Sequence, residues 1–398
     1  MDQLVLLTLR GVYLLYVSIL LVHGVLERRY ASSRRPRPRE GPPRTWAWGC
    51  GPWPAVDIII PCFNEQPSVL ETCCRTISEQ DYPGRIRVWL VDDGSSNRDL
   101  LLPVYEKYQR IGWQVKLLDR NVGKRLAQDA VYGCGDGELV VLMDSDTALA
   151  RDAIRSAAAV FADGDVAAAS GRVGVLNAAS NLLTRLIGER YRLRFELERP
   201  AQGYFDSLLC ASGPFSAYRR AVLDRLWRAY VEQSFARVPC TNGDDLHLTN
   251  LVLAAGKRLL FVPAIHALTC VPAEVGRYLR QQLRWHRSFY RELFWTFRAL
   301  RDRPAYLLLD VLARALLPLL LGAIPVLLAG EALLVGRDPL MADLSLLFTM
   351  LVLNAAILFV HGASMRFLML YGSLHVTLLI PIRVYALLTL ASPRWETR

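Results

Sequence analysis

Two acidic motifs and one basic-aromatic segment carry the side chains best suited to chemistry. Asp144-Ser145-Asp146 ends an apolar run that reads as a strand, and Gly243-Asp244-Asp245 follows about a hundred residues later. An extended strand that ends in Asp-x-Asp presents both carboxylates on the same side at the edge of a sheet, with Ser145 facing the other way. Hard divalent cations that bind phosphates prefer oxygen ligands of this kind. The first motif therefore predicts a site for a metal ion and a diphosphate.

The second acidic motif precedes the segment Gln281-Gln282-Leu283-Arg284-Trp285. Asp245, with Asp244 beside it, is the predicted general base, because transfer of a sugar to a hydroxyl requires removal of the hydroxyl proton. Arg284 can hold a diphosphate, and Trp285 can lie under an acceptor sugar ring. Together the motifs predict sugar transfer from a nucleotide diphosphate, with inversion at the anomeric carbon.

Each motif alone also has a purely structural interpretation. An Asp-x-Asp commonly lies in a turn or loop, and Asp244-Asp245 could cap a helix that begins at Leu246. Residues 281–285 could belong to an amphipathic helix that rests on lipid. The order and spacing of the motifs, and the position of the first at a strand end, favour the catalytic interpretation.

Further polar residues follow other predicted strands. Glu65 closes the first strand and is predicted to lie near a ribose or base. Asp92 and Asp93 close the next, where a carboxylate can accept the imide N–H of uracil. Lys124 lies near a helix start, which makes it a predicted phosphate contact. Such residues are also common in ordinary turns and solvated helix starts.

The elements that must position these residues alternate between strand and helix. The predicted strands are 56–60, 88–91 and 139–143, with a helix over 68–79. This rhythm predicts an α/β fold with a mainly parallel sheet. Ligands of such sheets bind at the carboxyl ends of the strands. The strand-end residues 64–65, 92–93 and 144–146 are therefore expected to converge.

Long apolar segments flank this region, and 53% of the 398 residues are hydrophobic. Residues 4–25 suit a membrane-spanning helix, and 315–335, 344–360 and 367–390 are further candidates. A cleaved signal peptide is disfavoured because the basic residues follow the first apolar segment. The Arg-rich sides of these spans predict that residues 28–303 face the cytoplasm and that both termini face out. Residues 274–297 mix Arg with aromatic residues and suit interfacial helices.

These features predict an organisation in five parts. The predicted parts are an N-terminal span (1–27), a basic Pro-rich linker (28–54), a catalytic domain (55–272), interfacial helices (273–303) and a C-terminal membrane region (304–398).

Charge and cysteine content exclude other classes of protein. The formal net charge is +10, and an Arg cluster follows the first span. No nucleic-acid module accompanies that cluster, so we expect an anchor to the lipid bilayer and no nucleic-acid partner. The eight cysteines show no zinc spacing, which predicts reduced thiols. Nothing in the sequence indicates an oligomeric state.

In combination, the motifs resemble those of processive family-2 glycosyltransferases, which include cellulose, chitin and hyaluronan synthases. The resemblance runs from about residue 56 to 297 through 91–95, 144–146, 243–245 and 281–285. Other segments are similar to the nodulation-factor chitooligosaccharide synthases of rhizobia, the NodC type. Those segments are Asn97-Arg98-Asp99, 121–125, 183–187, 278–284 and the tail 381–395.

The resemblance implies a GT-A type fold, a UDP-sugar donor, Mg²⁺ or Mn²⁺, and a growing oligosaccharide acceptor joined by β-linkages. The resemblance implies that Asp92 and Asp93 contact the uridine, and that Asp144 and Asp146 lie at the diphosphate and metal. It implies that Asp245 is the base and that Arg284 contacts the donor diphosphate. The residues implied to contact the acceptor are Trp285, Gly213, Pro214, Gln281 and Gln282.

The sequence departs from the family pattern at three places. Asp244 stands where nodulation synthases commonly carry Glu and hyaluronan synthases commonly carry Asp, and His286 and 240–242 also differ. The resemblance to the nodulation synthases, above all over 278–284 and the tail after residue 381, implies polymerisation of N-acetylglucosamine from UDP-N-acetylglucosamine into short β-1,4-linked chains. The alternative is hyaluronan synthesis from two UDP-sugars. A non-catalytic scaffold would be expected to lose the acidic motifs, and all of them are present.

Overall fold

The apolar runs predicted as strands form the centre of an α/β unit. In the computed structural model, which describes residues 2–33, 53–335 and 365–391, β1 spans Val56–Cys62, β2 spans Ile86–Asp92 and β4 spans Leu139–Leu142. Ile58, Ile60 and Leu90 are fully buried within this unit. Burial on both faces of the sheet explains why these strands read as continuous apolar runs.

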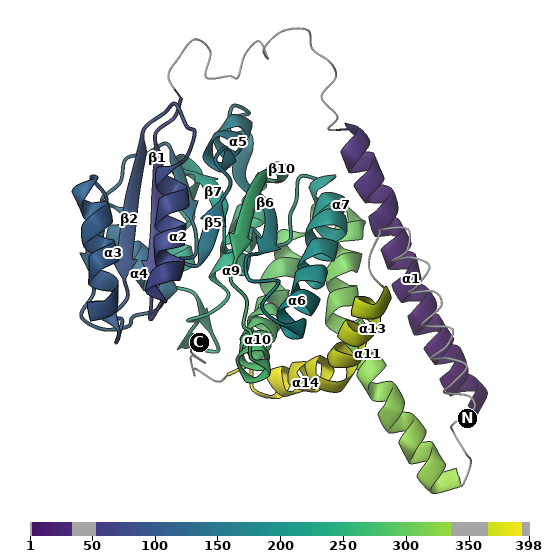
Figure 1. Ribbon diagram of the computed structural model, residues 1–398. Helices are drawn as coiled ribbons and strands as arrows, with labels where there is room; N and C mark the ends of the chain where they lie inside the picture. The colour runs from purple at the N-terminus through teal and green to yellow at the C-terminus, as the bar shows by residue number, and fades with distance from the viewer. Residues whose placement is uncertain (1, 34–52, 336–364, 392–398) are drawn as a thin grey trace.

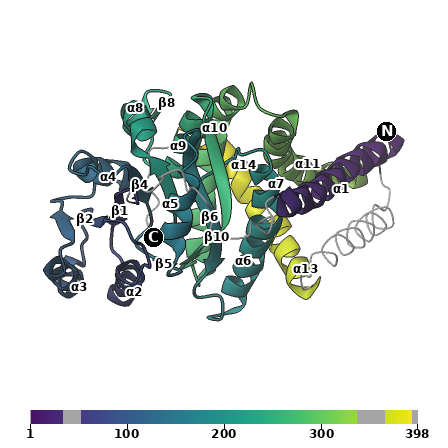
Figure 2. The same ribbon diagram turned by 90° about the horizontal axis from the view of Figure 1, so that it is seen from above.

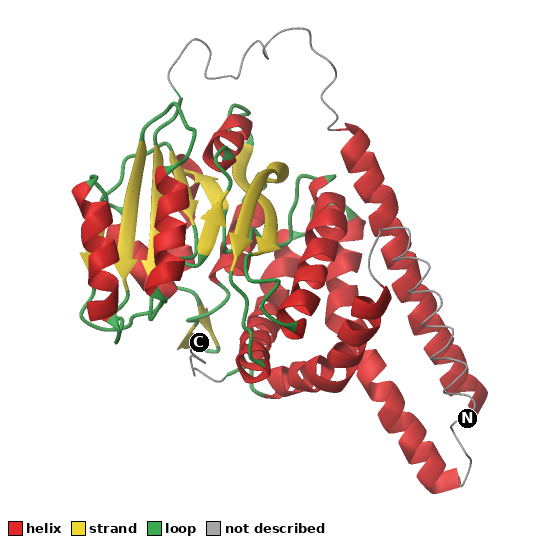
Figure 3. Cartoon of the chain, viewed as in Figure 1, coloured by secondary structure: helices red, strands yellow, loops and turns green. Residues whose placement is uncertain are grey.

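The sheet has eight strands in the order β3-β2-β1-β4-β7-β6-β10-β5, which Figure 3 shows in yellow. Strands β3, β2, β1 and β4 are parallel, as predicted. The other half is mixed, because β7 is antiparallel to both β4 and β6, and β5 is antiparallel to β10. The remaining strands are β3 (Gln114–Leu117), β5 (Thr147–Leu149), β6 (Val166–Val175), β7 (Ser216–Arg219) and β10 (Arg258–Thr269), with a hairpin of β8 (Ser234–Phe235) and β9 (Val238–Pro239) outside the sheet.

The expectation of a mainly parallel sheet is therefore correct only for the first half. The reversal of β7 has a simple cause. Its first residue, Ser216, pairs with Leu142 at the carboxyl end of β4. The preceding loop already lies at that edge, so the chain enters β7 there and runs in the opposite direction.

Helices cover both faces of the parallel half, as the view from above shows (Figure 2). The helix predicted over 68–79 is α2, Pro67–Ser78. The helix from α6 to α7 contains a π-helical turn, η1, that carries Arg194 and Glu198. The other helices of the unit are α3 (Arg98–Arg110), α4 (Lys124–Tyr132), α5 (Ala153–Val160), α6 (Leu182–Leu193), η1 (Arg194–Glu198), α7 (Arg199–Gly203), α8 (Arg220–Val231) and α9 (Asp244–Ala254).

Long helices gather beside the α/β unit (Figure 1). They are α1 (Asp2–Ser33), α10 (Val275–Ala299), α11 (Ala305–Val335) and the bent run α13 (Met365–Leu374), η2 (His375–Leu379) and α14 (Ile380–Leu388). Among the described residues, 370–388 form a helical stretch whose length and apolar composition would allow it to cross a membrane. The other predicted spans stay predictions, and 344–360 lies outside the described residues.

The interfacial segment is one continuous helix, α10, and not several. Its polar residues are not simply turned to solvent or lipid, since Gln282, His286 and Glu292 are buried. The helix α10 packs against α9 and α14. The mixed sequence of this segment therefore reflects contacts with the catalytic unit as well as an amphipathic surface.

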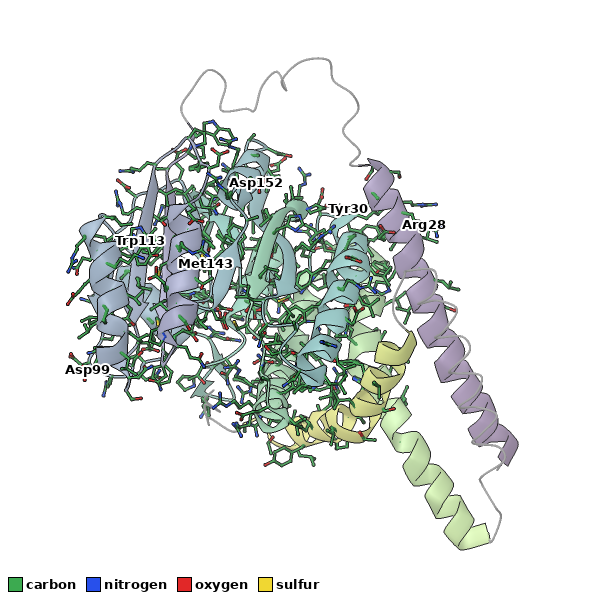
Figure 4. The ribbon with its side chains drawn as sticks, viewed as in Figure 1. Arg28, Tyr30, Asp99, Trp113, Met143 and Asp152 are labelled. Carbon is green, nitrogen blue, oxygen red and sulfur yellow. The ribbon has the colours of Figure 1, made fainter. Side chains whose placement is uncertain are left out.

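The N-terminal helix is attached to the α/β unit at its far end. Tyr30 is buried and its hydroxyl donates to the carbonyl of Phe261 on β10, whereas Arg28 is exposed (Figure 4). His23 on α1 lies 3.5 Å from Asp310 on α11. Asp310 also pairs with Arg314 at 2.9 Å, the pairing expected from their spacing on a helix.

Candidate active site

The carboxyl ends of β1, β2 and β4 bring their polar residues together. The Ser145 hydroxyl donates to Glu65 Oε2 at 3.0 Å, although the two residues lie eighty positions apart. Asn64 accepts from the Ser96 backbone N–H at 2.7 Å, and its own N–H donates to Ser95 Oγ at 3.0 Å. The strand-end residues therefore converge at one edge of the sheet.

Asp144-Ser145-Asp146 lies in a turn and not at the end of an extended strand. The Thr147 N–H donates to the Asp144 carbonyl at 3.3 Å, which closes the turn. The two carboxylates consequently separate: Asp146 is buried and accepts from the Thr269 hydroxyl at 3.0 Å, while Asp144 faces Lys124. Ser145 does not face away, as an extended chain would require, but points to Glu65.

Both carboxylate oxygens of Asp92 accept hydrogen bonds from residues of the following turn and helix. Its Oδ1 accepts from the Ser95 N–H at 3.0 Å and from two nitrogens of Arg98, and its Oδ2 accepts from the Tyr105 hydroxyl at 2.6 Å. Burial alone would raise the pKa of Asp92, but these hydrogen bonds lower it. The contacts make Asp92 the organiser of the β2–α3 turn, whereas the sequence interpretation gave it a bond to uracil.

Asp93 holds the loop that leads into α4. It accepts from the backbone N–H groups of Val122 at 2.7 Å and Gly123 at 2.9 Å, and from the Asn121 amide at 3.1 Å. Burial raises the pKa of Asp93 despite these bonds. Gly123 has a φ of 91°, which favours glycine and turns the chain into α4 at the next residue.

Lys124, the first residue of α4, joins the two acidic motifs. Its Nζ lies 2.8 Å from Asp144 Oδ1 and 2.7 Å from Asp244 Oδ2. Burial alone would lower the pKa of Lys124, but the two carboxylates raise it well above its usual value. Its ammonium therefore stays charged, and residues that lie 100 positions apart share one cation.

Arg125 fixes the loop before the second acidic motif. Its guanidinium donates to the carbonyls of Cys240 at 3.2 Å and Asn242 at 3.3 Å, and it lies over the ring of Tyr230. Two adjacent residues of α4 therefore fix the second acidic motif: Lys124 contacts the Asp244 carboxylate, and Arg125 binds the backbone that precedes it.

The helix that carries Arg284 and Trp285 meets the second acidic motif at Gly243. Gly243 has a φ of 77°, and a β-carbon there would lie 2.7 Å from Ser288 Cβ. Ser288 in turn donates to the Arg284 carbonyl at 3.0 Å. Glycine is therefore required both by the backbone conformation and by the close approach of α10.

A buried carboxylate sets the register between α9 and α10. Glu292 on α10 accepts from the Asn250 amide at 2.8 Å, contacts His247 at 3.1 Å and accepts from Gln233. This network lies two turns beyond Arg284 and Trp285 on the same helix. It holds those two residues, together with the half-buried Gln281 and the buried Gln282, beside the start of α9.

The pKa values of the neighbouring carboxylates Asp244 and Asp245 are shifted in opposite directions. Burial alone would raise the pKa of Asp244, but Lys124 and Arg125 lower it. Burial, and then the charge of Asp244, raise the pKa of Asp245. A raised pKa suits a carboxylate that must accept a proton. Asp245 Oδ2 also lies 3.3 Å from Cys210 Sγ, and burial raises the pKa of that thiol to about 12.

Gly213 and Pro214 belong to the loop that faces both acidic motifs. A β-carbon at Gly213 would lie 3.0 Å from Asp144 Oδ2 and 3.3 Å from Lys124 Nζ. A small pocket opens at this point, lined by Lys124, Gln128, Leu142, Gly213, Ser216, Tyr218, Tyr230, Asp244, Asp245 and Leu248. The structure thus brings Asp144, Lys124, Gly213, Asp244 and Asp245 to one place.

The site provides suitable ligands for a hard divalent cation. Asp144 and Asp146 provide carboxylate oxygens, and Gly213 leaves space beside Asp144 that any side chain would fill. Within the described residues, no three His, Cys, Asp or Glu side chains form a metal site. Asp144 and Asp146 face different partners, Lys124 and Thr269, so their role as metal ligands stays a prediction.

Sequence reasoning missed the residues that hold the site together. Arg98 and Tyr105 bind Asp92, Thr269 binds Asp146, and Cys210 contacts Asp245. Arg98 lies within the segment Asn97-Arg98-Asp99, and Cys210 begins the segment 210–214 that resembles an acceptor-facing loop, but neither resemblance predicts these contacts. No local pattern marks Tyr105 or Thr269.

Comparison with known proteins identifies the family of this chain. The sequence profile of glycosyl transferase family 2 matches residues 57–227. An N-acetylglucosaminyltransferase of Mesorhizobium japonicum is 42% identical over 352 residues, which cover 87% of this chain and 82% of that protein. The chain belongs to glycosyltransferase family 2. The resemblance to rhizobial NodC-type enzymes is thereby confirmed.

Other relatives of this glycosyltransferase have the same name. An N-acetylglucosaminyltransferase of Sinorhizobium fredii is 39% identical, over 88% of this chain and 85% of its own. An N-acetylglucosaminyltransferase of Rhizobium meliloti is 37% identical, over 87% of this chain and 82% of its own. These relatives span nearly the whole chain, so the similarity extends beyond the α/β unit.

A solved structure shares the architecture of this glycosyltransferase. The mannosyltransferase PcManGT from Pyrobaculum calidifontis, solved with GDP-Man and Mn²⁺, superposes with a TM-score of 0.63. The alignment covers 98% of this chain and 100% of that one at 21% identity. The likeness confirms the predicted GT-A type fold.

Proposed function

We propose that this glycosyltransferase polymerises N-acetylglucosamine from UDP-N-acetylglucosamine into short β-1,4-linked chitooligosaccharides. The observation that carries the proposal is the contact of Lys124 with both Asp144 and Asp244. Through this contact Asp144, proposed to lie at the donor diphosphate, and Asp244, beside the proposed base, share one cation, which supports a single reaction site. The names of the rhizobial relatives support N-acetylglucosamine as the sugar.

In the proposed reaction an acceptor hydroxyl attacks the anomeric carbon of the donor. Asp245 takes the hydroxyl proton as the new C–O bond forms and the bond to the diphosphate breaks, so UDP leaves and the anomeric centre inverts. The raised pKa of Asp245 suits this role. Asp244, whose pKa is lowered, holds Lys124 in place as a charged partner.

The leaving diphosphate needs positive charge. Lys124 supplies a half-buried ammonium at the meeting point of the motifs, and Arg284, beside Gly243, is the proposed second cation. Asp144 and Asp146 would hold Mg²⁺ or Mn²⁺. Such an ion neutralises charge that develops on a departing diphosphate.

The nucleotide is proposed to lie along the edge formed by β1, β2 and β4. Glu65 and Asp93 line this edge, and Asp92 acts through the turn that it holds. Gly213, Pro214, Gln281, Gln282 and Trp285 are the proposed acceptor contacts. The acceptor is the growing oligosaccharide itself.

We further propose a multi-pass enzyme of the bacterial inner membrane with a cytoplasmic catalytic part. The proposed parts are those predicted from the sequence, 1–27, 28–54, 55–272, 273–303 and 304–398. The helical stretch 370–388 supports contact with a lipid bilayer.

Product analysis with separate donors tests the proposed sugar. Membranes that contain the enzyme are incubated with divalent metal and UDP-N-acetylglucosamine alone, UDP-glucuronate alone, or both, and the product masses are measured. We expect short oligomers that grow by N-acetylglucosamine units with the first donor alone. A product that forms only with both donors would contradict the proposal in favour of hyaluronan synthesis.

A further inference from the structure

The short segment that carries Cys210 is held from both sides. On one side, the Leu209 backbone N–H donates to Gln202 Oε1 at 3.2 Å. On the other, the Ala211 N–H donates to Thr249 Oγ1 at 2.8 Å, and Thr249 itself donates to the Asp245 carbonyl at 2.7 Å. Between these anchors, Cys210 Sγ contacts the Asp245 carboxylate. The position of this segment therefore bears directly on Asp245.

Gln202 is the anchor that reaches outside the α/β unit. It is almost completely buried, and its Nε2 donates to Asp310 Oδ2 on α11 at 2.9 Å. Its Oε1 accepts from Arg199 at 3.1 Å as well as from Leu209. The site needs a donor and an acceptor on one neutral side chain, which an amide provides and a carboxylate or thioether does not.

Asp310 is in turn the meeting point of several helices. Arg314 pairs with Asp310 at 2.9 Å and with Glu198 at 2.8 Å, and His23 of α1 approaches Asp310 to 3.5 Å. Glu198 also pairs with Arg190 at 2.6 Å. Since these groups are largely buried, their hydrogen bonds resist rearrangement. A continuous polar chain therefore runs from α1 and α11 through Gln202 to the contact with Asp245.

We infer that Gln202 is a positioning residue for Asp245, which couples the docking of α1 and α11 to the geometry of the base. The inference rests on the proposed role of Asp245 as the base. Gln202 does not touch a reacting atom. It sets the place of residues 209–211, and through Cys210 and Thr249 these residues define where the Asp245 carboxylate lies.

The test is the substitution Gln202→Met in the full-length enzyme, which keeps the size of the side chain and removes all three hydrogen bonds. We expect kcat to fall by up to about a hundredfold, the effect of a misplacement of about 1 Å, while KM for UDP-N-acetylglucosamine changes less than twofold. Gln80→Met is the matched control. Gln80 also makes three hydrogen bonds, and its partners Thr76, Ala150 and Ile154 lie outside the segments 202–211 and 245–249. It should lower stability and leave kcat unchanged.

A second readout does not depend on turnover. In the parent enzyme Cys210 is half-buried and contacts Asp245, so its alkylation, measured by peptide mass spectrometry, should be slow. Gln202→Met should accelerate alkylation of Cys210 and leave the buried Cys62, Cys73 and Cys74 protected. Parent-like alkylation and kcat in a folded Gln202→Met variant would overturn the inference.

Asp310→Asn tests the same chain if Gln202→Met does not accumulate as folded protein. It keeps the shape and weakens the bond from Gln202, so a smaller loss of kcat with faster Cys210 alkylation is expected. Parent values of both quantities would again overturn the inference. Asp245→Asn separates the two proposals: if that variant turns over normally, the proposed function fails, and if it is inactive while Gln202→Met matches Gln80→Met, only the role of Gln202 fails.

Discussion

The ammonium of Lys124 lies 2.7 Å from the carboxylate of Asp244. This ion pair distinguishes two adjacent acids that the sequence alone presents as equivalent. It lowers the pKa of Asp244, whereas burial and the charge of Asp244 raise the pKa of Asp245. Asp245 is consequently the residue better suited to receive a proton, and Asp244 the one better suited to orient a cation.

The first prediction concerns the base. Asp245→Asn keeps the shape and loses basicity, so kcat should fall about a hundred- to ten-thousand-fold while UDP binding, measured by calorimetry, stays near the parent value. Asp165→Asn, at an exposed site away from the motifs, is the control and should behave as the parent. An active Asp245→Asn with an inactive Asp244→Asn would exchange the two roles.

The pH dependence of kcat/KM is the second prediction. Asp245 must be deprotonated to act, so activity should fall as the pH drops through its raised pKa. Asp244→Asn removes a negative charge beside Asp245 and should shift this acid limb to lower pH. Lys124→Met removes a positive charge and should shift it to higher pH. Shifts in the reverse directions, or none, would show that another group controls the limb.

The third prediction concerns the carboxylates expected to hold metal and diphosphate. Asp144→Ala and Asp146→Ala should each lose nearly all transfer, since phosphate charge then lacks its neutralising partner. Removal of divalent metal from the parent enzyme by a chelator should have the same effect, reversed by Mg²⁺ or Mn²⁺. Parent rates in either variant at ordinary metal concentrations would contradict the assignment.

A fourth prediction follows from the contact between Gly243 and Ser288. Gly243→Ala adds a β-carbon 2.7 Å from Ser288 Cβ at a φ of 77°, so it should cost about 1–2 kcal/mol for the backbone and more for the displaced α10. Adding Ser288→Gly should restore the stability lost through the clash with α10, whereas the stability lost through the backbone conformation at residue 243 should remain lost. Gly112→Ala, at a φ of 97° with open space, measures the backbone part alone. Thermal unfolding of these three variants and the parent provides the comparison, and equal losses of stability at Gly243 and Gly112 would exclude the clash.

The fifth prediction concerns membrane topology. Reporter fusions should place both termini outside the cytoplasm and residues 28–303 inside, because Arg clusters follow the first predicted span and precede the next. A reporter that is cytoplasmic at the C-terminus would show that the number of later spans is even.

Local sequence patterns predict much of the architecture. β1, β2, β4 and α2 lie where apolar runs and helical periodicity predict them, because burial on both faces of a parallel sheet demands apolar, β-branched residues. The strand ends also identify the edge at which Glu65, Asp93 and Asp144 gather, since parallel strands share one carboxyl edge.

Local patterns do not predict the direction in which a strand joins the sheet or which distant segments contact each other. The antiparallel course of β7 and the different partners of Asp144 and Asp146 follow from contacts across the fold. The same holds for the two roles of the Asp244-Asp245 pair. A pKa depends on burial and on charges within a few ångströms, and Lys124 reaches Asp244 only when the sheet has brought together residues 120 positions apart. Residue types alone therefore determined which groups could do the chemistry, whereas packing in three dimensions decided what each group does, because burial and charge proximity exist only in the folded chain.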